Sequence, residues 1–504
     1  MRNLYFRLMV GIIILAASTA WSLPPTVGPA LRTIEATKSI DVDSYFDANR
    51  LFMVVYNNGQ VAYDNAVVYG RVDGLYYPYS GYPSVPGFKT VVYAAGIFMG
   101  GKVDGEIRIA AAEYSTEYVP GPMAGGTFQP DQPSFHVYKI DRNSGPGDPD
   151  YDQWPASEGA PVDQFGQPLL LGDQTLWAVF NDADFSHHTN KCGGTAPLGI
   201  EVQQTVWGSD VPGEQTVLYI KYKIYNKGTN PIDSFFVSFW ADPDLGDASN
   251  DLVGCDTTSD IFFAYNAGLD AVYNPDTPVW GGKLLSGPVV PSAGDTAIFD
   301  GQPMPGFRNL GMFSFGRYIN GTDPQSAQQT FNYMKGLDGN GSPNVDPFGY
   351  VTRFPYSGDP VNGTGWLDDG PSDKRLMASF GNLHLDPGDS QQVVLKLVAY
   401  AAEDFSVAFT ELKQALDSAA VVVNAPEFVD CDSAKVLITD YHELANVYFV
   451  SAINPGWLRG YGWGGDFFNG SADYGIRFLG SSLDPETSPE SFHNVEVRFS
   501  QVYK

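Results

Sequence analysis

The sequence predicts a mostly β protein: an antiparallel β-sandwich of immunoglobulin-like or jelly-roll-like type, with one helix and a smaller C-terminal β unit. Two observations lead to this fold class. Gly (55) and Pro (36) together make 91 of the 504 residues, and this content favours many turns between short strands. The clearest strand, 217–225, alternates lysines with apolar residues at a period of two, which is typical of a strand with one solvated face.

Strand and turn patterns divide the chain into consecutive parts. We expect, in order, a signal peptide (1–22), a linker (23–40), an N-terminal β region with long loops (41–200), a β-sandwich with a long insertion (201–402), a helix (403–425) and a C-terminal β unit (426–504). In the helix, apolar residues recur three or four positions apart, and Asp404 is the expected N-cap.

The first 22 residues have the features of an export signal. Arg2 and Arg7 precede the apolar run 8–17, and Ser18 and Ala20 are spaced like the small residues of a cleavage site. The apolar run is shorter than the roughly 20 residues that a membrane-spanning helix needs, although an uncleaved anchor is the alternative. We therefore expect a secreted or cell-surface protein whose mature part has no transmembrane span.

Strand-like runs on both sides of a short turn predict four β-hairpins. Their turns are expected at 57–59, 100–101, 226–231 and 386–389. Gly, Asn, Asp and Pro in these segments favour chain reversal. Hairpins of this length favour an antiparallel sandwich over a fold of alternating strands and helices.

The charge of the chain excludes some partners. Asp and Glu number 58 against 29 Lys and Arg, so the net charge is −29. A chain this acidic repels the phosphates of nucleic acids and of anionic lipids. We therefore expect no nucleic-acid partner, and a cell-surface or glycan partner stays open. The sequence does not set the oligomeric state.

The chain has three cysteines, Cys192, Cys255 and Cys431. So few cysteines in so long a chain exclude disulfides as its main framework. Cys192 and Cys255 flank the same strand-rich stretch, so their pairing is the favoured one of three. The sequence leaves that pairing open.

The most unusual segment is the aspartate-rich stretch 242–256. Nine aspartates and no Lys or Arg lie between Lys227 and Lys283. Crowded carboxylates repel one another, and a calcium ion, which takes six to eight oxygen ligands, would relieve this repulsion. The alternative is a solvated loop in which aspartates cap turns. The predicted calcium ligands are Asp242, Asp244, Asp247, Asp251 and Asp256.

Two further polar segments are weaker metal candidates. The loop 338–346 places oxygen donors at alternate positions but lacks the Gly and the bidentate Glu of a calcium loop. The segment 181–188 combines two aspartates with the adjacent His187 and His188. An exposed loop is the alternative to a transition-metal site there.

The sequence has none of the G-x-S-x-G, P-loop or G-x-G-x-x-G motifs of common enzyme classes. We therefore expect a non-enzymatic structural or binding protein that calcium stabilises, and we assign no catalytic residue. The alternative is a secreted carbohydrate-active enzyme or carbohydrate-binding module. Aromatic residues at 76–82 and 457–463 could offer flat faces to sugar rings, or they could pack the ends of the sandwich.

Several phrases of the sequence carry a family resemblance. They include AAAEYSTEYV (110–119), LGDQTLWAVFNDAD (171–184), PLGIEVQQT (197–205) and SADYGIRFLGSSL (471–483). The chain resembles an uncharacterised family of large secreted β-rich proteins of environmental bacteria, many of which carry C-terminal sorting domains. Such a domain is not recognisable before Lys504, so we expect either a truncated chain or another export route. The unit around Asn226 is also similar to bacterial immunoglobulin-like surface modules.

Overall fold

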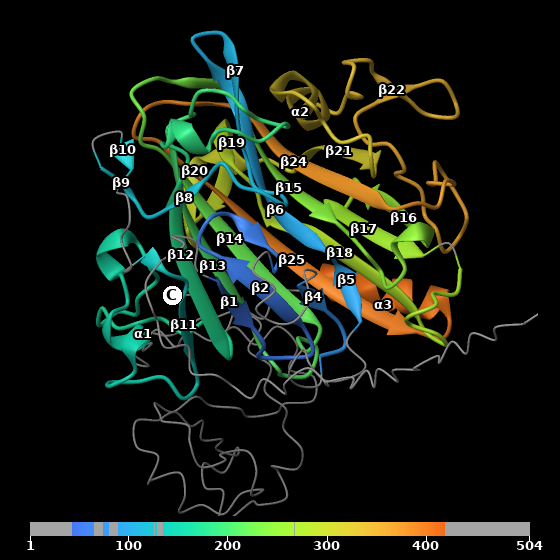
Figure 1. Cartoon of the computed structure of the whole chain (residues 1–504), viewed down its shortest axis with the longest axis horizontal. Helices are drawn as coiled ribbons and strands as arrows, with labels where there is room; N and C mark the ends of the chain where they lie inside the picture. Colours follow the sequence, from blue (N-terminus) through green and yellow to red (C-terminus); the bar gives the residue numbers. More distant parts are fainter. Residues whose placement is uncertain are drawn as a thin grey trace, which may run out of the picture. The chain divides into compact units, whose positions relative to one another are not determined.

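The computed structural model describes residues 43–64, 74–79, 89–124, 127–128, 135–266 and 268–418. The predictions for the signal peptide, the linker, Cys431, the C-terminal β unit and the aromatic residues at 82 and 457–463 lie outside these residues. Within them, two large antiparallel sheets pack against each other, so the predicted mostly β, sandwich-type fold is confirmed (Figure 1). The immunoglobulin-like or jelly-roll-like subtype stays a prediction.

The first sheet has ten strands in the described residues, all antiparallel to their neighbours. In spatial order they are β21 (Met312–Ile319), β24 (Lys374–Leu385), β15 (Ile232–Asp242), β6 (Ala94–Val103), β3 (Gln60–Val61), β2 (Phe52–Tyr56), β4 (Leu75–Tyr76) and β5 (Thr90–Val92), with β1 (Asp43–Phe46) beside β2 and β7 (Glu106–Ala111) beside β6. The strand order does not follow the chain order, so the sheet depends on contacts between distant segments.

The second sheet has nine strands in the same part of the chain. In spatial order they are β11 (Tyr138–Asp141), β12 (Gln174–Asn181), β13 (Ile200–Gly208), β14 (Val217–Asn226), β25 (Ser390–Ala402), β18 (Thr277–Ser286), β17 (Ile261–Asn266) and β16 (Asp251–Asp256), with β8 (Val119–Pro120) beside β12. Three small two-stranded sheets complete the β structure of the described residues: β9 (Met123–Ala124) with β10 (Thr127–Phe128), β19 (Val289–Phe299) with β20 (Gln302–Asn309), and β22 (Asn344–Val345) with β23 (Val351–Thr352).

The core lies between the two large sheets. Ile220 and Tyr222 of β14 are buried in it, while the intervening Lys221 is half-buried on the other face, so the predicted period of two is confirmed. The rings of Phe239 in β15 and Phe262 in β17 meet across the two sheets, with centroids 5.7 Å apart. Burial of these apolar side chains is the main favourable contribution to folding.

The predicted boundary at residue 200 does not separate two folding units. The first sheet contains strands from 43–111 and from 232–385, and the second contains strands from 119–208 and from 217–402. Each sheet therefore takes strands from both sides of the boundary. Strand periodicity identifies single strands, but it does not show which distant strands pair.

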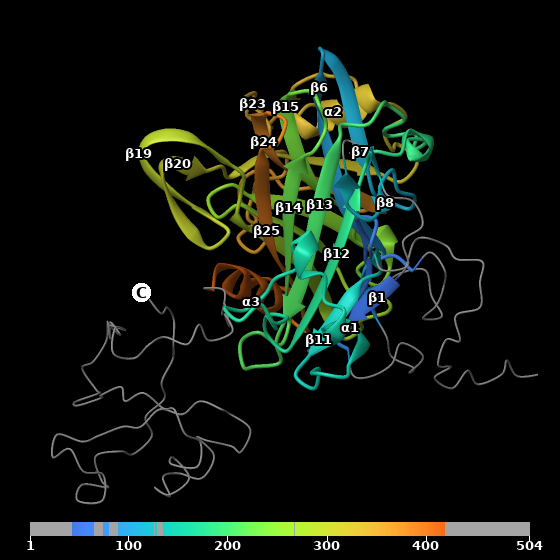
Figure 2. The ribbon, with the colours of Figure 1, turned by 90° about the vertical axis from the view of Figure 1, so that its left-hand side faces the viewer.

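Two of the four predicted hairpins are instead connections between the sheets. β14 pairs with β25 in the second sheet, and β15 pairs with β24 in the first. The turns 226–231 and 386–389 therefore carry the chain from one sheet to the other. The four strands that they join are labelled in Figure 2. The hairpin prediction is wrong there because alternation identifies the buried face of a strand and not its neighbour.

The other two predicted hairpins form, one of them with a displaced turn. β2 pairs with β3 as expected. β6 continues through Gly100 and Gly101, and the chain reverses at Asp104 and Gly105, whose φ angles are 53° and 85°. These positive φ angles suit a tight hairpin turn. A Cβ atom on Gly100 would lie 2.7 Å from the sulfur of Met334, so glycine there allows close packing.

Helices cover the outer faces of both sheets. The predicted helix is α3 (Phe405–Asp417), and Asp404 caps it by accepting a hydrogen bond from the Ser406 backbone N–H at 2.8 Å. Its buried side chains pack on the outer face of the second sheet. Two further helices, α2 (Ala327–Met334), which covers the first sheet, and α1 (Pro149–Asp152), are too short to give a clear periodic signal in the sequence and were not predicted. In the described residues, no helix has the length and apolar character to cross a membrane.

Asn226 joins the two connections between the sheets. Its side-chain N–H groups donate to the backbone carbonyls of Asn230 and Leu385 at 2.9 and 3.0 Å. Its backbone N–H donates to the carbonyl of Asp389, and its carbonyl accepts from the N–H of Gly388. One fully buried asparagine thus satisfies backbone groups of both connections.

We expect Asn226→Ala to lower the free energy of unfolding by about 2 kcal/mol or more, because it leaves two carbonyls without their donors. Urea denaturation followed by tryptophan fluorescence measures this change. Asn230→Ala is the matched control, since Asn230 takes part through its backbone carbonyl, and its effect should stay within about 0.5 kcal/mol. Equal effects of the two substitutions would contradict this role of Asn226.

Candidate metal centre

The structure brings two of the five predicted calcium ligands together and adds a carboxylate that the sequence analysis missed. One oxygen atom from each of Asp242, Asp244 and Asp373 lies within 4.8 Å of the others. Asp242 ends β15, and Asp373 directly precedes β24. These strands are neighbours in the first sheet, which brings together residues that are distant in the sequence. A search for local clusters of aspartates could not find Asp373.

Arg375 supplies the positive charge beside these carboxylates. Its guanidinium group forms ion pairs with Asp373, with Asp242 at 3.1 Å and with Asp323 at 3.6 Å. The Tyr114 hydroxyl donates to Asp242 Oδ2 at 2.7 Å and accepts from Arg375 Nε at 2.9 Å. We call this group of six residues the acidic corner; its members are Tyr114, Asp242, Asp244, Asp323, Asp373 and Arg375.

Asp242 is the most constrained member of the acidic corner. Its relative exposure is 2%, and its Oδ1 atom is buried without a hydrogen-bond partner. Burial raises the pKa of Asp242 well above its usual value, the Arg375 charge opposes this increase, and the Asp244 charge adds to it. A buried carboxylate oxygen without a partner is costly, so a cation at this position would be stabilising.

The three other predicted ligands lie apart from this cluster of oxygens. Asp251 is fully buried beside the acidic corner, and its Oδ1 atom also has no hydrogen-bond partner. Asp247 is exposed and caps its own short 3-10 turn by accepting from Ser249 N–H at 3.0 Å. Asp256 pairs with Lys413 of α3. Burial would raise the pKa of Asp256, but hydrogen bonds from Lys413 and Thr258 outweigh it and lower the pKa to about 2.

The aspartates of the loop 338–346 close their own turns. Asp338 Oδ1 accepts hydrogen bonds from the backbone N–H groups of Asn340 and Ser342 at 2.9 and 2.8 Å. Asp346 Oδ1 bonds in the same way to the N–H groups two and four residues further along. Such turns explain the alternating oxygen donors of this loop without a metal ion.

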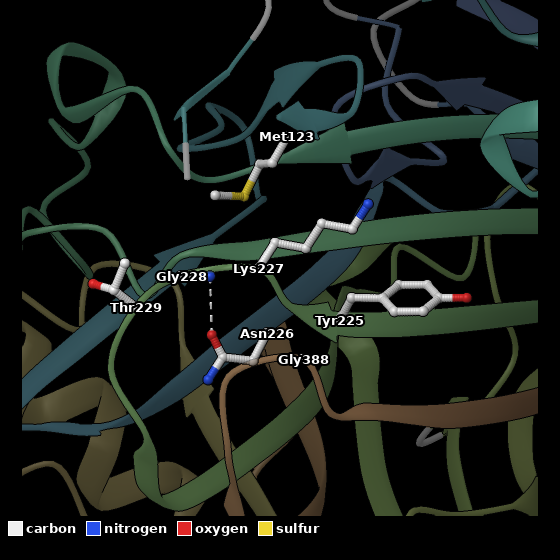
Figure 3. A pocket seen from close by; sticks show the side chains of 7 residues that line it. All are labelled: Met123, Tyr225, Asn226, Lys227, Gly228, Thr229 and Gly388. Carbon is white, nitrogen blue, oxygen red and sulfur yellow. Dashed lines mark hydrogen bonds between the residues drawn. The ribbon is translucent and has the colours of Figure 1, made fainter. Parts of the chain in front are cut away.

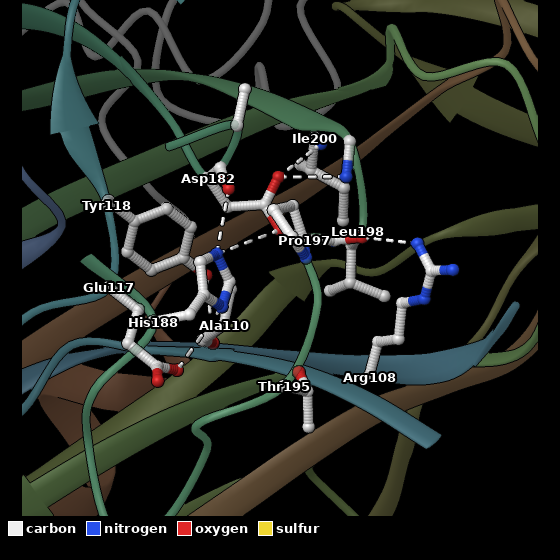
Figure 4. A network of polar contacts seen from close by, with 12 residues as sticks. Arg108, Ala110, Glu117, Tyr118, Asp182, His188, Thr195, Pro197, Leu198 and Ile200 are labelled. Atoms are coloured by element: carbon white, nitrogen blue, oxygen red, sulfur yellow. Dashed lines mark hydrogen bonds and ion pairs between the residues drawn. The ribbon is translucent and has the colours of Figure 1, made fainter. Parts of the chain in front are cut away.

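The segment 181–188 contributes to a buried polar network (Figure 4). The Asp182 carboxylate accepts three hydrogen bonds, from the N–H groups of Leu198, Gly199 and Ile200, at 2.5 to 2.9 Å. His188 Nε2 lies 2.8 Å from the Asp182 carbonyl oxygen, and His188 Nδ1 lies 4.0 Å from Glu117. The side chains of His188, Asp182 and Glu117 are fully buried and hold loops together. The middle of the segment is an exposed turn, in which His187 Nδ1 lies 2.7 Å from Asp184.

The favoured disulfide between Cys192 and Cys255 is wrong. Both residues are buried free thiols. Cys192 packs on the outer side of the first sheet, whereas Cys255 lies in the core between the sheets. Proximity to the same strand-rich stretch did not indicate proximity in space.

The described aromatic residues of the 76–82 cluster pack inside the protein. Tyr76 and Tyr77 are buried, and the Tyr79 ring packs on Phe52 with centroids 5.5 Å apart. The packing alternative therefore holds for these tyrosines. Two aromatic residues that the sequence analysis did not single out, Phe348 and Tyr350, are each 72% exposed between β22 and β23.

Glu113 lies near the acidic corner and carries the clearest pH signal. Burial, followed by repulsion from Asp323, raises the pKa of Glu113 to about 7, although hydrogen bonds with Asn190 and Cys192 oppose this shift. The folded chain therefore holds an extra proton between the unfolded-state pKa of 4.5 and pH 7. A folded-state pKa above the unfolded value means that stability falls as the pH rises through this range.

We expect Glu113→Gln to raise the free energy of unfolding at pH 8 by on the order of 2 kcal/mol, and to change little at pH 4. The substitution mimics the protonated carboxyl group. Urea denaturation at pH 4, 6 and 8 measures the difference, and the exposed Glu106→Gln serves as control. A difference that does not vary with pH would contradict the assigned environment of Glu113.

Comparisons with known proteins do not assign a family. No family model matches the chain, and no curated protein matches its sequence. Among solved structures, the chain is similar to a protein from Escherichia coli K12 described as a "putative aldose 1-epimerase", with 10% sequence identity. The match covers 71% of this chain and 99% of that one, with a TM-score of 0.24. A similarity this low carries no argument about function.

Proposed function

We propose that the chain is an exported, non-enzymatic structural or binding module whose acidic corner holds one calcium ion. The observation that carries this proposal is the buried Asp242 Oδ1 atom, which lacks a hydrogen-bond partner and belongs to a group of three close carboxylates. The export signal expected at residues 1–22 supports an extracellular location. Calcium-binding modules of the extracellular space commonly bind the ion with dissociation constants near 10⁻⁴ to 10⁻³ M.

The charges at the acidic corner are unbalanced. Three carboxylates, those of Asp242, Asp323 and Asp373, form ion pairs with one guanidinium group, and the Asp244 carboxylate lies close to two of them. A divalent cation between Asp242, Asp244 and Asp373 would bring the charge of the acidic corner near neutrality. Arg375 stays bound to Asp242 Oδ2 and leaves the Oδ1 atom for the ion.

Calcium suits this arrangement better than magnesium or a transition metal. The donors are carboxylate oxygens only, which hard cations prefer. Calcium accepts irregular geometry and completes its shell with carbonyl groups and water, whereas magnesium demands a near-ideal octahedron. The three carboxylate oxygens lie within 4.8 Å of one another, which suits the flexible coordination geometry of calcium.

A bound ion would stabilise the junction of three segments. Asp242 ends β15, Asp244 lies in the following loop, and Asp373 leads into β24. An ion that binds only the folded chain adds about 2.7 kcal/mol to the free energy of unfolding when its concentration is a hundred times the dissociation constant. Calcium would therefore act as a clip at one end of the first sheet.

We expect millimolar calcium to raise the melting temperature by several degrees above that in excess chelator. Asp244→Asn should abolish this response while remaining at least as stable as the unchanged chain in chelator, because it removes a charge that repels Asp242. Differential scanning calorimetry measures both effects.

The matched control for this experiment is Asp247→Asn, an aspartate of the same loop that caps a turn outside the acidic corner. It should lose up to about 1 kcal/mol of stability and keep the full calcium response. Superimposable melting curves of the unchanged chain in calcium and in chelator would rule out the calcium clip.

A further inference from the structure

The described part of the protein contains a cup of about 550 Å³ at the edge where the chain crosses between the sheets (Figure 3). Side chains of Met123, Tyr225, Lys227 and Thr229 line it, together with the backbone at Gly388. Its volume lies in the range of sites that hold small organic ligands. The cup is distinct from the acidic corner, since none of its lining residues belongs to that group.

The floor of the cup is rigid because its backbone groups are already paired. Gly228 N–H donates to the carbonyl of Gly199 and to the Asn226 side chain at 2.9 and 3.1 Å. Asn226 itself is bound to both connections between the sheets, as described above. A preformed floor loses little conformational freedom when a ligand binds.

The wall of the cup presents one fixed aromatic ring. The ammonium groups of Lys223 and Lys227 each lie 5.6 Å from the centre of the Tyr225 ring. Met123 and the exposed Thr229 complete the lining of the cup (Figure 3). An aromatic face next to several hydrogen-bond donors suits a ligand that has an apolar ring face and hydroxyl groups at its rim.

The charges around the cup favour an uncharged ligand. Lys227 pairs with the buried Glu201 at 2.9 Å, and Lys223 pairs with Asp300 at 2.8 Å. The ammonium group of Lys227, which lines the cup, is therefore neutralised within the chain and still has further N–H bonds to donate. Lys223 lies outside the lining and shares Asp300 with Lys221. The net charge of −29 also repels anionic ligands at long range.

We propose that this cup binds a neutral saccharide. The C–H face of one sugar ring packs against Tyr225 and Met123, and its hydroxyl groups bond with Lys227 and Thr229. The proposal does not depend on calcium, because the cup and the acidic corner share no residue.

Affinity electrophoresis in native gels tests the proposal with the full chain. Dextran, soluble starch and pullulan are the neutral probes, and alginate is the acidic one. We expect at least one neutral polysaccharide to retard the unchanged chain, and Tyr225→Ala to weaken this binding about tenfold. Tyr350→Ala is the matched control, since Tyr350 is exposed outside the cup, and it should bind like the unchanged chain.

The melting temperature of Tyr225→Ala in calcium and in chelator shows whether this variant folds, and separates failure of the cup from failure of the calcium clip. If none of the three neutral polysaccharides retards the unchanged chain, the proposal is overturned. It is also overturned if a correctly folded Tyr225→Ala binds as tightly as the unchanged chain. Retardation by alginate alone, lost in high salt, would overturn the choice of a neutral ligand.

Discussion

The fold depends on the cations that pair with the carboxylates packed near the start of β24. Removing a charge from water costs free energy unless an opposite charge pairs with it. Two adjacent cations, Lys374 and Arg375, form these ion pairs. Successive residues of a strand point to opposite faces, so each cation serves a different set of carboxylates. Lys374 pairs with Asp368 at 2.9 Å, and both side chains are fully buried. Arg375 is instead shared among Asp242, Asp323 and Asp373, which leaves the acidic corner short of positive charge.

The two proposed sites lie at opposite ends of the same strand. β15 leaves the connection beside the cup at Ile232 and reaches the acidic corner at Asp242. Its 11 residues span roughly 35 Å at the usual rise of a strand. At this distance the cup and the acidic corner have no shared contacts, so each can be tested by itself. The interleaved sheets make the described chain one structural unit on which both sites are built.

Local features of the fold could be predicted from the sequence, whereas strand pairing could not. The alternation in 217–225 identified the buried face of β14, and Asp404 identified the start of α3, because both depend on neighbours in the chain. The turns at 226–231 and 386–389 were located, but whether they join neighbours or cross between sheets depends on β25 and β24. The same limit applies to the acidic corner: Asp242 and Asp244 stand in a conspicuous local cluster, but Asp373 joins them only through the pairing of β15 with β24.

The acidic corner needs a calcium ion to balance its charge if the proposed function is right. A crystal structure from a calcium-containing solution, with anomalous scattering data, would show whether the ion is bound there. We expect an anomalous peak about 2.3 to 2.6 Å from oxygens of Asp242, Asp244 and Asp373. Asp242 bonded only to Arg375, Tyr114 and ordered water in such a crystal, with no anomalous peak, would contradict the proposed calcium site.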